Sequence, residues 1–271
     1  MTVCIGAICE DGHAIVVAAD RMMTYGAPLN LQVEMTVRKI VPVTGTTAVL
    51  FSGSVPDGEG VISRTRAKIA ATAQTVHEIA TATVAAYQEL KRQRVEDTIL
   101  RPLLGIDFVA FTQLVAQSAS SQILQQVLGM ISQQNMQLDL LVVGFDDGVG
   151  HIFGITNPGV LVPGDTVGSL AIGSGAMHAS VRLSLGKQVR DLKFPQTVYN
   201  VYEAKVAAEV APGVGKMTDM AVLRPSGIDF FKDAAFDVLS SIRQDRPPLG
   251  GNESKQLADL CKDYSHEPAK P

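Results

Sequence analysis

Two apolar runs meet at a tight turn in residues 2–20, which read TVCIGAICEDGHAIVVAAD. The first run covers residues 3–9 and the second covers residues 14–19. Asp11-Gly12 stands between them, and an Asp-Gly pair between apolar runs favours a β-hairpin. The sequence therefore predicts that the chain begins with two antiparallel strands.

The same pattern of apolar runs joined by turn residues recurs along the chain, and helical patterns lie between the groups of strands. Further hairpins are predicted over residues 39–51, 138–155 and 220–231, and helices over 61–95, 108–134, 176–185 and 198–208. Hairpin-linked strands form antiparallel sheets, so we predict an α+β fold, a four-layer αββα sandwich of two antiparallel sheets flanked by helix pairs. We expect this domain to span residues 1–242 and residues 243–271 to form a loosely ordered tail.

Composition narrows the class of protein. The chain has 271 residues, 46% of them hydrophobic, and a net charge of −4. This excludes a mostly disordered chain and disfavours general nucleic-acid binding, which needs many cationic contacts. No apolar run approaches the roughly 18 residues of a membrane-spanning helix, and Glu10 and Asp11 argue against a signal peptide. Cys4, Cys9 and Cys261 make neither a disulfide framework nor a metal-ligand cluster. We expect a cytoplasmic protein that uses no metal, no cofactor and no membrane.

Thr2 is the first candidate for chemistry. Removal of Met1 would give Thr2 a free α-amine beside its own hydroxyl. Because an α-amine has a pKa of about 7.7–8.0, it can accept a proton near neutral pH. One residue would then supply both nucleophile and base, which is the N-terminal-threonine form of nucleophilic catalysis. Threonine is also common at position 2, so this residue alone does not separate a nucleophile from an ordinary second residue.

Four other residues could assist Thr2, and each has a plainer alternative. Asp20 ends the second strand and Lys39 begins the third, so the carboxylate could hold the lysine charged and the ammonium could favour loss of the threonine proton. Alone, this pair could equally be a salt bridge at the rim. Gly53 could offer its N–H to an oxyanion or form an ordinary turn. Ser174 could orient the nucleophile or cap the following helix.

Taken together, the motifs resemble the proteasome β-subunit family of N-terminal-nucleophile threonine hydrolases. The resemblance spans residues 2 to about 231 and rests on Thr2, AADR at 18–21, RKI at 38–40, Ser52-Gly53, LVVGFD at 141–146, AIGSG at 171–175 and MTDMAV at 217–222. The first strand begins at residue 3, which is similar to bacterial proteasome-like subunits in which removal of Met1 alone exposes the threonine.

The resemblance implies a threonine endopeptidase. It makes Thr2 the nucleophile and base, Asp20 and Lys39 the activating pair, Gly53 the oxyanion donor and Ser174 a support for the amine. It also assigns an apolar primary specificity pocket, and hence cleavage after hydrophobic residues, to five positions that could equally be core: Met23, Val37, Val41, Phe51 and Val55. The implied assembly is a homo-oligomer, a ring or stacked rings, that takes polypeptide substrates, with an ATPase unfoldase as a further partner.

One segment departs from the family pattern, which has an aspartate near the amine and a serine three residues later. Residues 208–215 read AEVAPGVG here. Glu209 could replace the aspartate with a shift of register, whereas Val214 can neither donate nor accept a hydrogen bond. This leaves open a second interpretation, a catalytically silent proteasome-like scaffold or assembly protein, which a retained Met1 would favour. A nucleophile at Cys4 or Cys9 is disfavoured, because both lie inside the first strand with no partner histidine nearby in sequence.

Overall fold

In the computed structural model of the chain, the described residues are 2–25, 31–34, 37–69, 75–118 and 122–244. The chain divides into two compact units, Met1–Phe231 and Lys232–Pro271. The described part of the second unit contains helix α8 (Asp233–Gln244). The expected boundary after residue 242 stays a prediction, and most of the expected tail, residues 245–271, lies outside the described residues.

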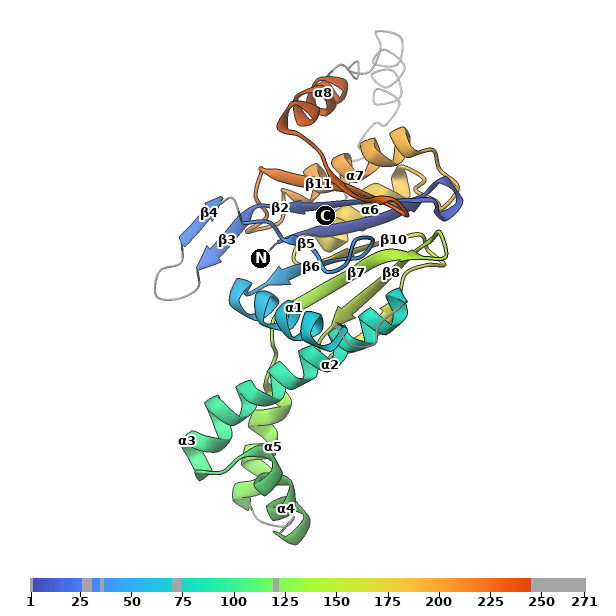
Figure 1. The fold of residues 1–271 in the computed structure, drawn as a ribbon. Coiled ribbons are helices and arrows are strands. Elements are labelled where there is room, and N and C mark those ends of the chain that lie inside the picture. Colours follow the sequence, from blue (N-terminus) through green and yellow to red (C-terminus); the bar gives the residue numbers. More distant parts are fainter. Residues whose placement is uncertain (1, 26–30, 35–36, 70–74, 119–121, 245–271) are drawn as a thin grey trace, which may run out of the picture. The chain divides into compact units, whose positions relative to one another are not determined.

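Two five-stranded antiparallel sheets form the centre of the first unit (Figure 1). The first sheet has the order β10-β1-β2-β11-β12, with the bounds Ser169–Ile172, Cys4–Cys9, Ala14–Asp20, Thr218–Arg224 and Gly227–Phe230. The second has the order β5-β6-β7-β8-β9, with the bounds Ile40–Pro42, Ala48–Gly53, Leu138–Asp146, Val149–Thr156 and Val160–Pro163. A 3-10 turn, η1 (Glu10–Gly12), joins β1 to β2. The pair β3 (Met22–Tyr25) and β4 (Leu31–Glu34) and strand β9 are additions to the sequence prediction.

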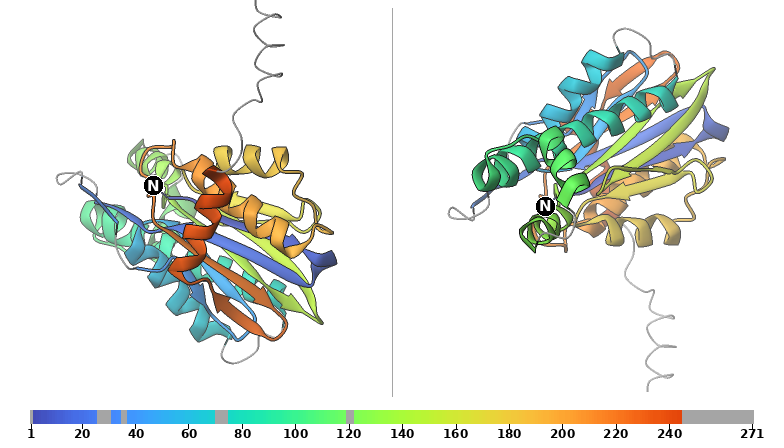
Figure 2. Two further views of the ribbon diagram at one scale, coloured as in Figure 1. Left: turned by 90° about the horizontal axis from the view of Figure 1, so that it is seen from above. Right: turned by 90° about the horizontal axis from the view of Figure 1, so that it is seen from below.

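A helix pair covers the outer face of each sheet. Helices α1 (Val55–Ile69) and α2 (Val76–Val95) pack on the second sheet through β6, β7 and β8. Helices α6 (Ala176–Leu185) and α7 (Phe194–Ala208) pack on the first through β1, β2 and β10. Figure 2 shows these pairs from above and from below. The predicted four-layer αββα sandwich is confirmed.

The strands carry apolar residues on both faces because both faces of each sheet are covered. Strand β7 illustrates this arrangement, since successive side chains of a strand point to opposite sides. Leu141 and Val143 belong to the core between the sheets. Leu140 and Val142 belong to the cluster beneath α1 and α2. The two cores together fix which face of β7 points toward the opposing sheet.

The single helix predicted over residues 61–95 is wrong. Helix α1 ends at Ile69 and α2 begins at Val76. Thr75 caps α2, because its hydroxyl accepts a hydrogen bond from the Glu78 N–H (3.1 Å) while the Glu78 carboxylate accepts one from the Thr75 N–H (2.9 Å). This capping box gives α2 its own beginning.

The helix predicted over residues 108–134 is likewise two helices, α4 (Phe108–Ser118) and α5 (Gln122–Gln133). They share an apolar cluster with the π-helical turn η2 (Glu96–Leu100), which leads from α2 into α3 (Arg101–Leu104). Among the described residues no single helix is long and apolar enough to span a membrane, although the bent pair Val76–Leu104 and Phe108–Gln117 meets that test by length and composition.

Candidate active site

The structure brings Thr2, Asp20 and Lys39 together at one end of the two sheets. Strand β2 ends at Asp20 beside the start of β1, and β5 begins directly after Lys39. The Lys39 ammonium donates to the Thr2 hydroxyl and to the Met22 carbonyl (2.6 Å), and it lies 3.2 Å from Asp20 Oδ1. Thr2, Asp20 and Lys39 are each at most 2% exposed. The interaction that the spacing predicted is therefore a buried one, not a salt bridge at the rim.

Asp20 does more than face the lysine. Its Oδ1 accepts hydrogen bonds from the Val3 N–H (2.9 Å) and from Lys39, and its Oδ2 accepts from the N–H groups of Met22 (3.0 Å) and Gly215 (3.1 Å). Four donors from four chain segments therefore satisfy one fully buried carboxylate. Such a carboxylate holds the segments around Thr2 in a fixed arrangement.

Ser174 lies at the backbone nitrogen of Thr2. The Thr2 N–H donates to Ser174 Oγ at 3.1 Å, and the Gly175 N–H donates to the Thr2 carbonyl at 3.3 Å. Ser174 follows β10 and precedes α6, so the end of that strand sets its position. The expected neighbourhood of Ser174 and the threonine nitrogen is therefore present.

Gly53 ends β6 with a φ of 122°, in the region that favours glycine. A side chain at this position would run into the backbone carbonyl of Gln137. Gly173 has a φ of 91°, and a side chain there would meet the Thr2 carbonyl and the Ser52 hydroxyl. Gly53 therefore lets the end of β6 approach the start of β7 closely, and Gly173 lets the end of β10 approach Thr2.

The segment after α7 differs from the expectation for Glu209. The Lys205 ammonium, which is fully buried, donates to Glu209 Oε1 (2.7 Å) and to the Lys216 carbonyl (2.6 Å). Burial lowers the pKa of Lys205, and the hydrogen bond with Glu209 acts in the opposite direction. The Lys205–Glu209 pair thus fixes the loop that presents the Gly215 N–H to Asp20.

Apolar groups pack against Gly175 in the segment that departs from the family pattern. A side chain on Gly175 would meet the methyl groups of Ala208 and Val214. Both residues are buried. Val214 therefore fills space beside the Thr2 segment and takes no part in hydrogen bonding through its side chain.

The two candidate cysteines have the wrong electrostatics for a nucleophile. Burial raises the pKa of the Cys4 thiol far above its ordinary value, more than the nearby Lys39 lowers it. Burial also raises the pKa of Cys9 to about 11. Because the thiolate is the nucleophilic form, both thiols are inert near neutral pH.

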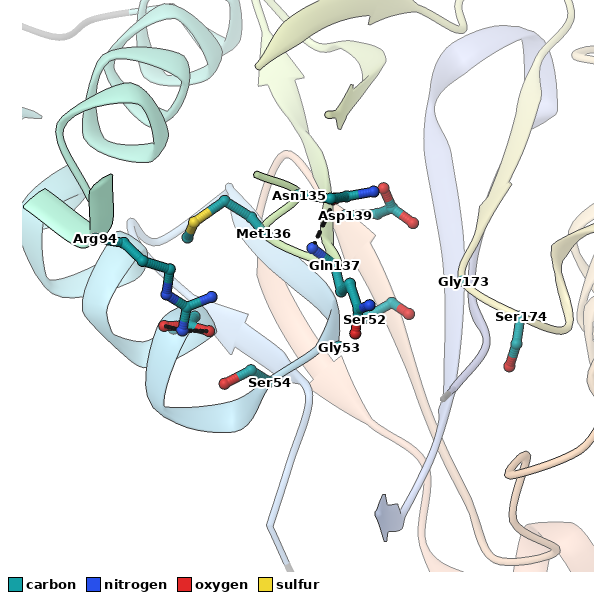
Figure 3. Close-up of a pocket in the computed structure, with 11 residues that line it drawn as sticks. Ser52, Gly53, Ser54, Arg94, Asn135, Met136, Gln137, Asp139, Gly173 and Ser174 are labelled. Carbon is teal, nitrogen blue, oxygen red and sulfur yellow. Dashed lines mark hydrogen bonds and ion pairs between the residues drawn. The ribbon is translucent and has the colours of Figure 1, made fainter. Parts of the chain in front are cut away.

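Two cavities border this group of residues. A cleft of about 550 Å³ is lined by Ser52, Gly53, Asp139, Gly173 and Ser174 on the side of Thr2, and by Arg94 and Met136 among others (Figure 3). A second cavity of about 400 Å³ is lined by Val41, Phe51 and Ile62, with Arg38, Glu59 and Arg66 at the same cavity. Cavities of 300–1,000 Å³ are typical of ligand sites.

The five predicted specificity residues lie in different places. Val41 and Phe51 line the second cavity, and both pack with Val55 in the apolar cluster beneath α1 and α2. Met23 lies on β3 opposite Val33 of β4. Val37 lies between β4 and β5. Met23, Val37 and Val55 are not among the described residues that line this cavity, and the specificity pocket stays a prediction.

Sequence reasoning missed two residues of this region. Lys205 was hidden in a helical pattern, although its i,i+4 spacing from Glu209 is a usual sign of an ion pair. Asp139 is a lone acidic residue in the apolar strand β7, and its partner Ser52 is apparent only from strand pairing. No group of three or more histidine, cysteine, aspartate or glutamate residues in the described part of the chain could hold a metal ion.

Comparison with known proteins finds a family similarity in the first part of the chain. Residues 2–106, which include Thr2, Asp20, Lys39 and Gly53, match the family model described as Proteasome subunit. Over these residues the chain is similar to proteasome subunits. Its two antiparallel sheets with flanking helices agree with the fold of that family. No curated protein matches the chain.

The match over residues 2–106 indicates the class of function. The family makes hydrolase or protease chemistry the expected class, and its members generally form oligomeric rings. The nucleophile, the specificity and the ring partners of this particular protein are matters for proposal.

Proposed function

We propose that this protein is a threonine-type peptidase of a self-compartmentalising, proteasome-like assembly, with Thr2 as its nucleophile. The observation that carries the proposal is the Lys39 ammonium, buried and donating to the Thr2 hydroxyl. Moving an ammonium out of water costs free energy that a hydrogen bond to a neutral hydroxyl does not offset. Here it lies where an alkoxide would form, and a neighbouring cation favours that charged form.

The chemistry begins once Met1 is removed. The Thr2 hydroxyl attacks the carbonyl carbon of the scissile amide, and its proton passes to the free α-amine of the same residue. Lys39 stabilises the forming alkoxide, and Ser174 orients the amine through the contact of 3.1 Å. The β-branch of threonine restricts its χ1 angle and so aims the hydroxyl.

The tetrahedral intermediate then needs a donor for its oxyanion. We assign this role to the Gly53 N–H, because Gly53 ends β6 and lines the same cleft as Ser174. The protonated amine gives its proton to the leaving nitrogen, and the carbon–nitrogen bond breaks to leave an ester on Thr2 Oγ1. Water, deprotonated by the same amine, hydrolyses the ester and restores Thr2.

The second cavity supports a preference for a hydrophobic residue before the cut bond. Phe51, Val41 and Ile62 supply its apolar surface. Arg38, Glu59 and Arg66 lie at the same cavity, so we expect it to admit an apolar side chain of moderate length and to leave its outer part polar. Met23 and Val37 are retained as proposed contacts of a bound substrate.

The assembly and its location follow from the same proposal. We infer a homo-oligomer that encloses Thr2 within a ring or stacked rings, acts on polypeptides in the cytoplasm and accepts substrate from an ATPase unfoldase. Enclosure in a ring would admit only unfolded polypeptides to Thr2, which is consistent with the burial of Thr2.

One observation favours the second candidate function, a catalytically silent scaffold. Met1 precedes Thr2 in the sequence, so the backbone nitrogen of Thr2 belongs to a peptide bond until Met1 is removed. Val214, whose side chain can neither donate nor accept a hydrogen bond, also lies near this segment. A protein that keeps Met1 would retain the fold without a usable base.

The test is the intact mass of the purified protein before and after exposure to a peptide epoxyketone, a reagent that needs both a free amine and its neighbouring hydroxyl. The peptidase proposal expects loss of Met1 and one adduct, and Thr2→Ala serves as the control that forms none. Hydrolysis of fluorogenic peptides should disappear in Thr2→Ala and in Lys39→Ala. A retained Met1 with no adduct, or full hydrolysis by Thr2→Ala, would overturn the proposal.

A further inference from the structure

Strand β7 carries a carboxylate on a face that is otherwise apolar. Leu141 and Val143 point into the core between the sheets. Asp139 has the same parity, so it lies at the end of this row, where it faces the 550 Å³ cleft. It is partly buried, and burial raises its pKa, while a hydrogen bond from the Gly173 N–H acts in the opposite direction. A charge placed here destabilises the fold, which calls for an explanation.

The charges around the cleft leave Asp139 without a cation. Arg94 and Asp57 also line the cleft, but they pair with each other at 2.7 and 2.8 Å. Among the described residues that line the cleft, Asp139 is the charge with no opposite charge in an ion pair. The cleft therefore has a net negative charge, and a positively charged ligand group would find an unused acceptor there.

The carboxylate is also close to the proposed reaction centre. Asp139 lies directly opposite Ser52 across the β6–β7 pair. Its other neighbour, Gly173, directly precedes Ser174, which contacts the Thr2 nitrogen. Figure 3 shows Ser52, Gly53 and Asp139 between Arg94 on one side and Gly173 and Ser174 on the other. A group bound at Asp139 would therefore lie beside a peptide held at Thr2.

The cleft and the apolar cavity lie on opposite faces of one strand end. Phe51 lines the apolar cavity and Ser52, the next residue of β6, lines the cleft. Neighbouring residues of a strand point to opposite faces. Successive side chains of an extended polypeptide also point to opposite sides, so a polypeptide that passes the end of β6 can direct one side chain toward each cavity.

We propose that Asp139 is a specificity-determining residue that binds a basic side chain, lysine or arginine, of a polypeptide positioned for cleavage at Thr2. The inference rests on the proposed peptidase function and adds a second requirement, a basic residue close to the cut bond. The methylene groups of the basic side chain contact Met136, and its charged end forms an ion pair with the carboxylate. The polar cleft and the apolar cavity thus select different residues of one substrate.

Binding to the full-length assembly of Thr2→Ala tests this without requiring hydrolysis. Two peptides are used that differ at one position, lysine or its neutral straight-chain counterpart norleucine, and this position is moved through the residues next to the hydrophobic one. At the best position we expect the lysine peptide to bind about tenfold tighter, as for a charge-assisted hydrogen bond. Asp139→Asn, which keeps an acceptor for Gly173, should reduce the ratio to about one. Asp147→Asn removes a similar charge from an exposed turn and should leave the ratio unchanged.

The outcomes separate the two proposals. Equal binding of both peptides at every position, no binding of either, or a lysine preference that survives Asp139→Asn would overturn the role of Asp139. Loss of the preference in Asp139→Asn, with the oligomer intact, supports it. If the preference is present but the epoxyketone forms no adduct on the unmodified protein, the peptidase proposal fails while the cationic subsite stands.

Discussion

Asp20 and Lys39 should differ in their contribution to stability, although the proposed activity requires both. Asp20→Ala removes the acceptor of three backbone N–H groups, those of Val3, Met22 and Gly215, and leaves the Lys39 ammonium buried without its carboxylate. Lys39→Met keeps the apolar stem and leaves Asp20 with all three backbone donors. We therefore expect Asp20→Ala to be clearly the more destabilising change.

The magnitudes follow from the contacts that are lost. Each buried group left without a partner costs about 1–3 kcal/mol. Three orphaned N–H groups and an unpaired ammonium, partly relieved by water, make Asp20→Ala cost about 5 kcal/mol. Lys39→Met leaves the Met22 carbonyl without its donor and removes one of four donors to Asp20, so its cost is about 2 kcal/mol.

Urea unfolding at one protein concentration measures the difference. With a slope of about 2.5 kcal/mol/M, a difference of about 3 kcal/mol separates the two unfolding midpoints by about 1 M. Thr2→Ala, which removes the hydroxyl that accepts from Lys39 but leaves the Asp20–Lys39 ion pair in place, is the control. Peptide hydrolysis should be reduced by about 10³-fold or more in all three variants. A midpoint for Lys39→Met equal to or below that of Asp20→Ala would refute the division of roles.

Three further predictions concern single positions. Gly53→Ala should lower the free energy of unfolding by about 1–3 kcal/mol and abolish hydrolysis, because φ is 122° and the new side chain meets the Gln137 carbonyl; thermal unfolding and a peptide assay check this. Asp139→Asn should raise the melting temperature at pH 7 but not at a pH below about 4. The pKa of Asp139 is raised in the native state, so the native state binds the carboxyl proton more tightly than the unfolded state, and stability is lost as the pH rises through the native pKa. An equal change in melting temperature at both pH values would contradict this. The lowered pKa of Lys205 means that the native state releases its proton first, so the stability of the unmodified protein relative to Lys205→Met should increase from neutral pH towards about 10.4; a constant difference in urea midpoints would count against this.

Local patterns explain what the sequence could predict of the fold. Apolar runs around Asp11-Gly12 and Asp147-Gly148 identify hairpins because turn chemistry and alternation act over a few residues. The break between α1 and α2 went unrecognised although Thr75 and Glu78 have the spacing of a capping box. The composition of the region resembles one long helix, and that pattern outweighed the cap. Amino-acid composition therefore predicted well which residues are helical but predicted poorly where each helix begins and ends.

The residues of the candidate site also differ in whether local sequence patterns could group them. Thr2, Asp20 and Lys39 could be grouped from sequence because each sits at the end of a predictable strand. Lys205 could not, since its second acceptor, the Lys216 carbonyl, lies in an irregular loop. Asp139 needed the register of β6 against β7, which apolar patterning leaves undetermined until both cores are known.

The energetics of the site also bear on the choice between a peptidase and a scaffold. Asp20 alone is explained by the fold, because it accepts three backbone N–H groups that would otherwise be buried without partners. Lys39 is not explained in this way. Replacing both partners of a buried ion pair by apolar groups of similar volume is often neutral or stabilising, so a fold does not depend on having such a pair. A silent scaffold has no use for an ammonium directed at the Thr2 hydroxyl, whereas the proposed threonine nucleophile needs it there.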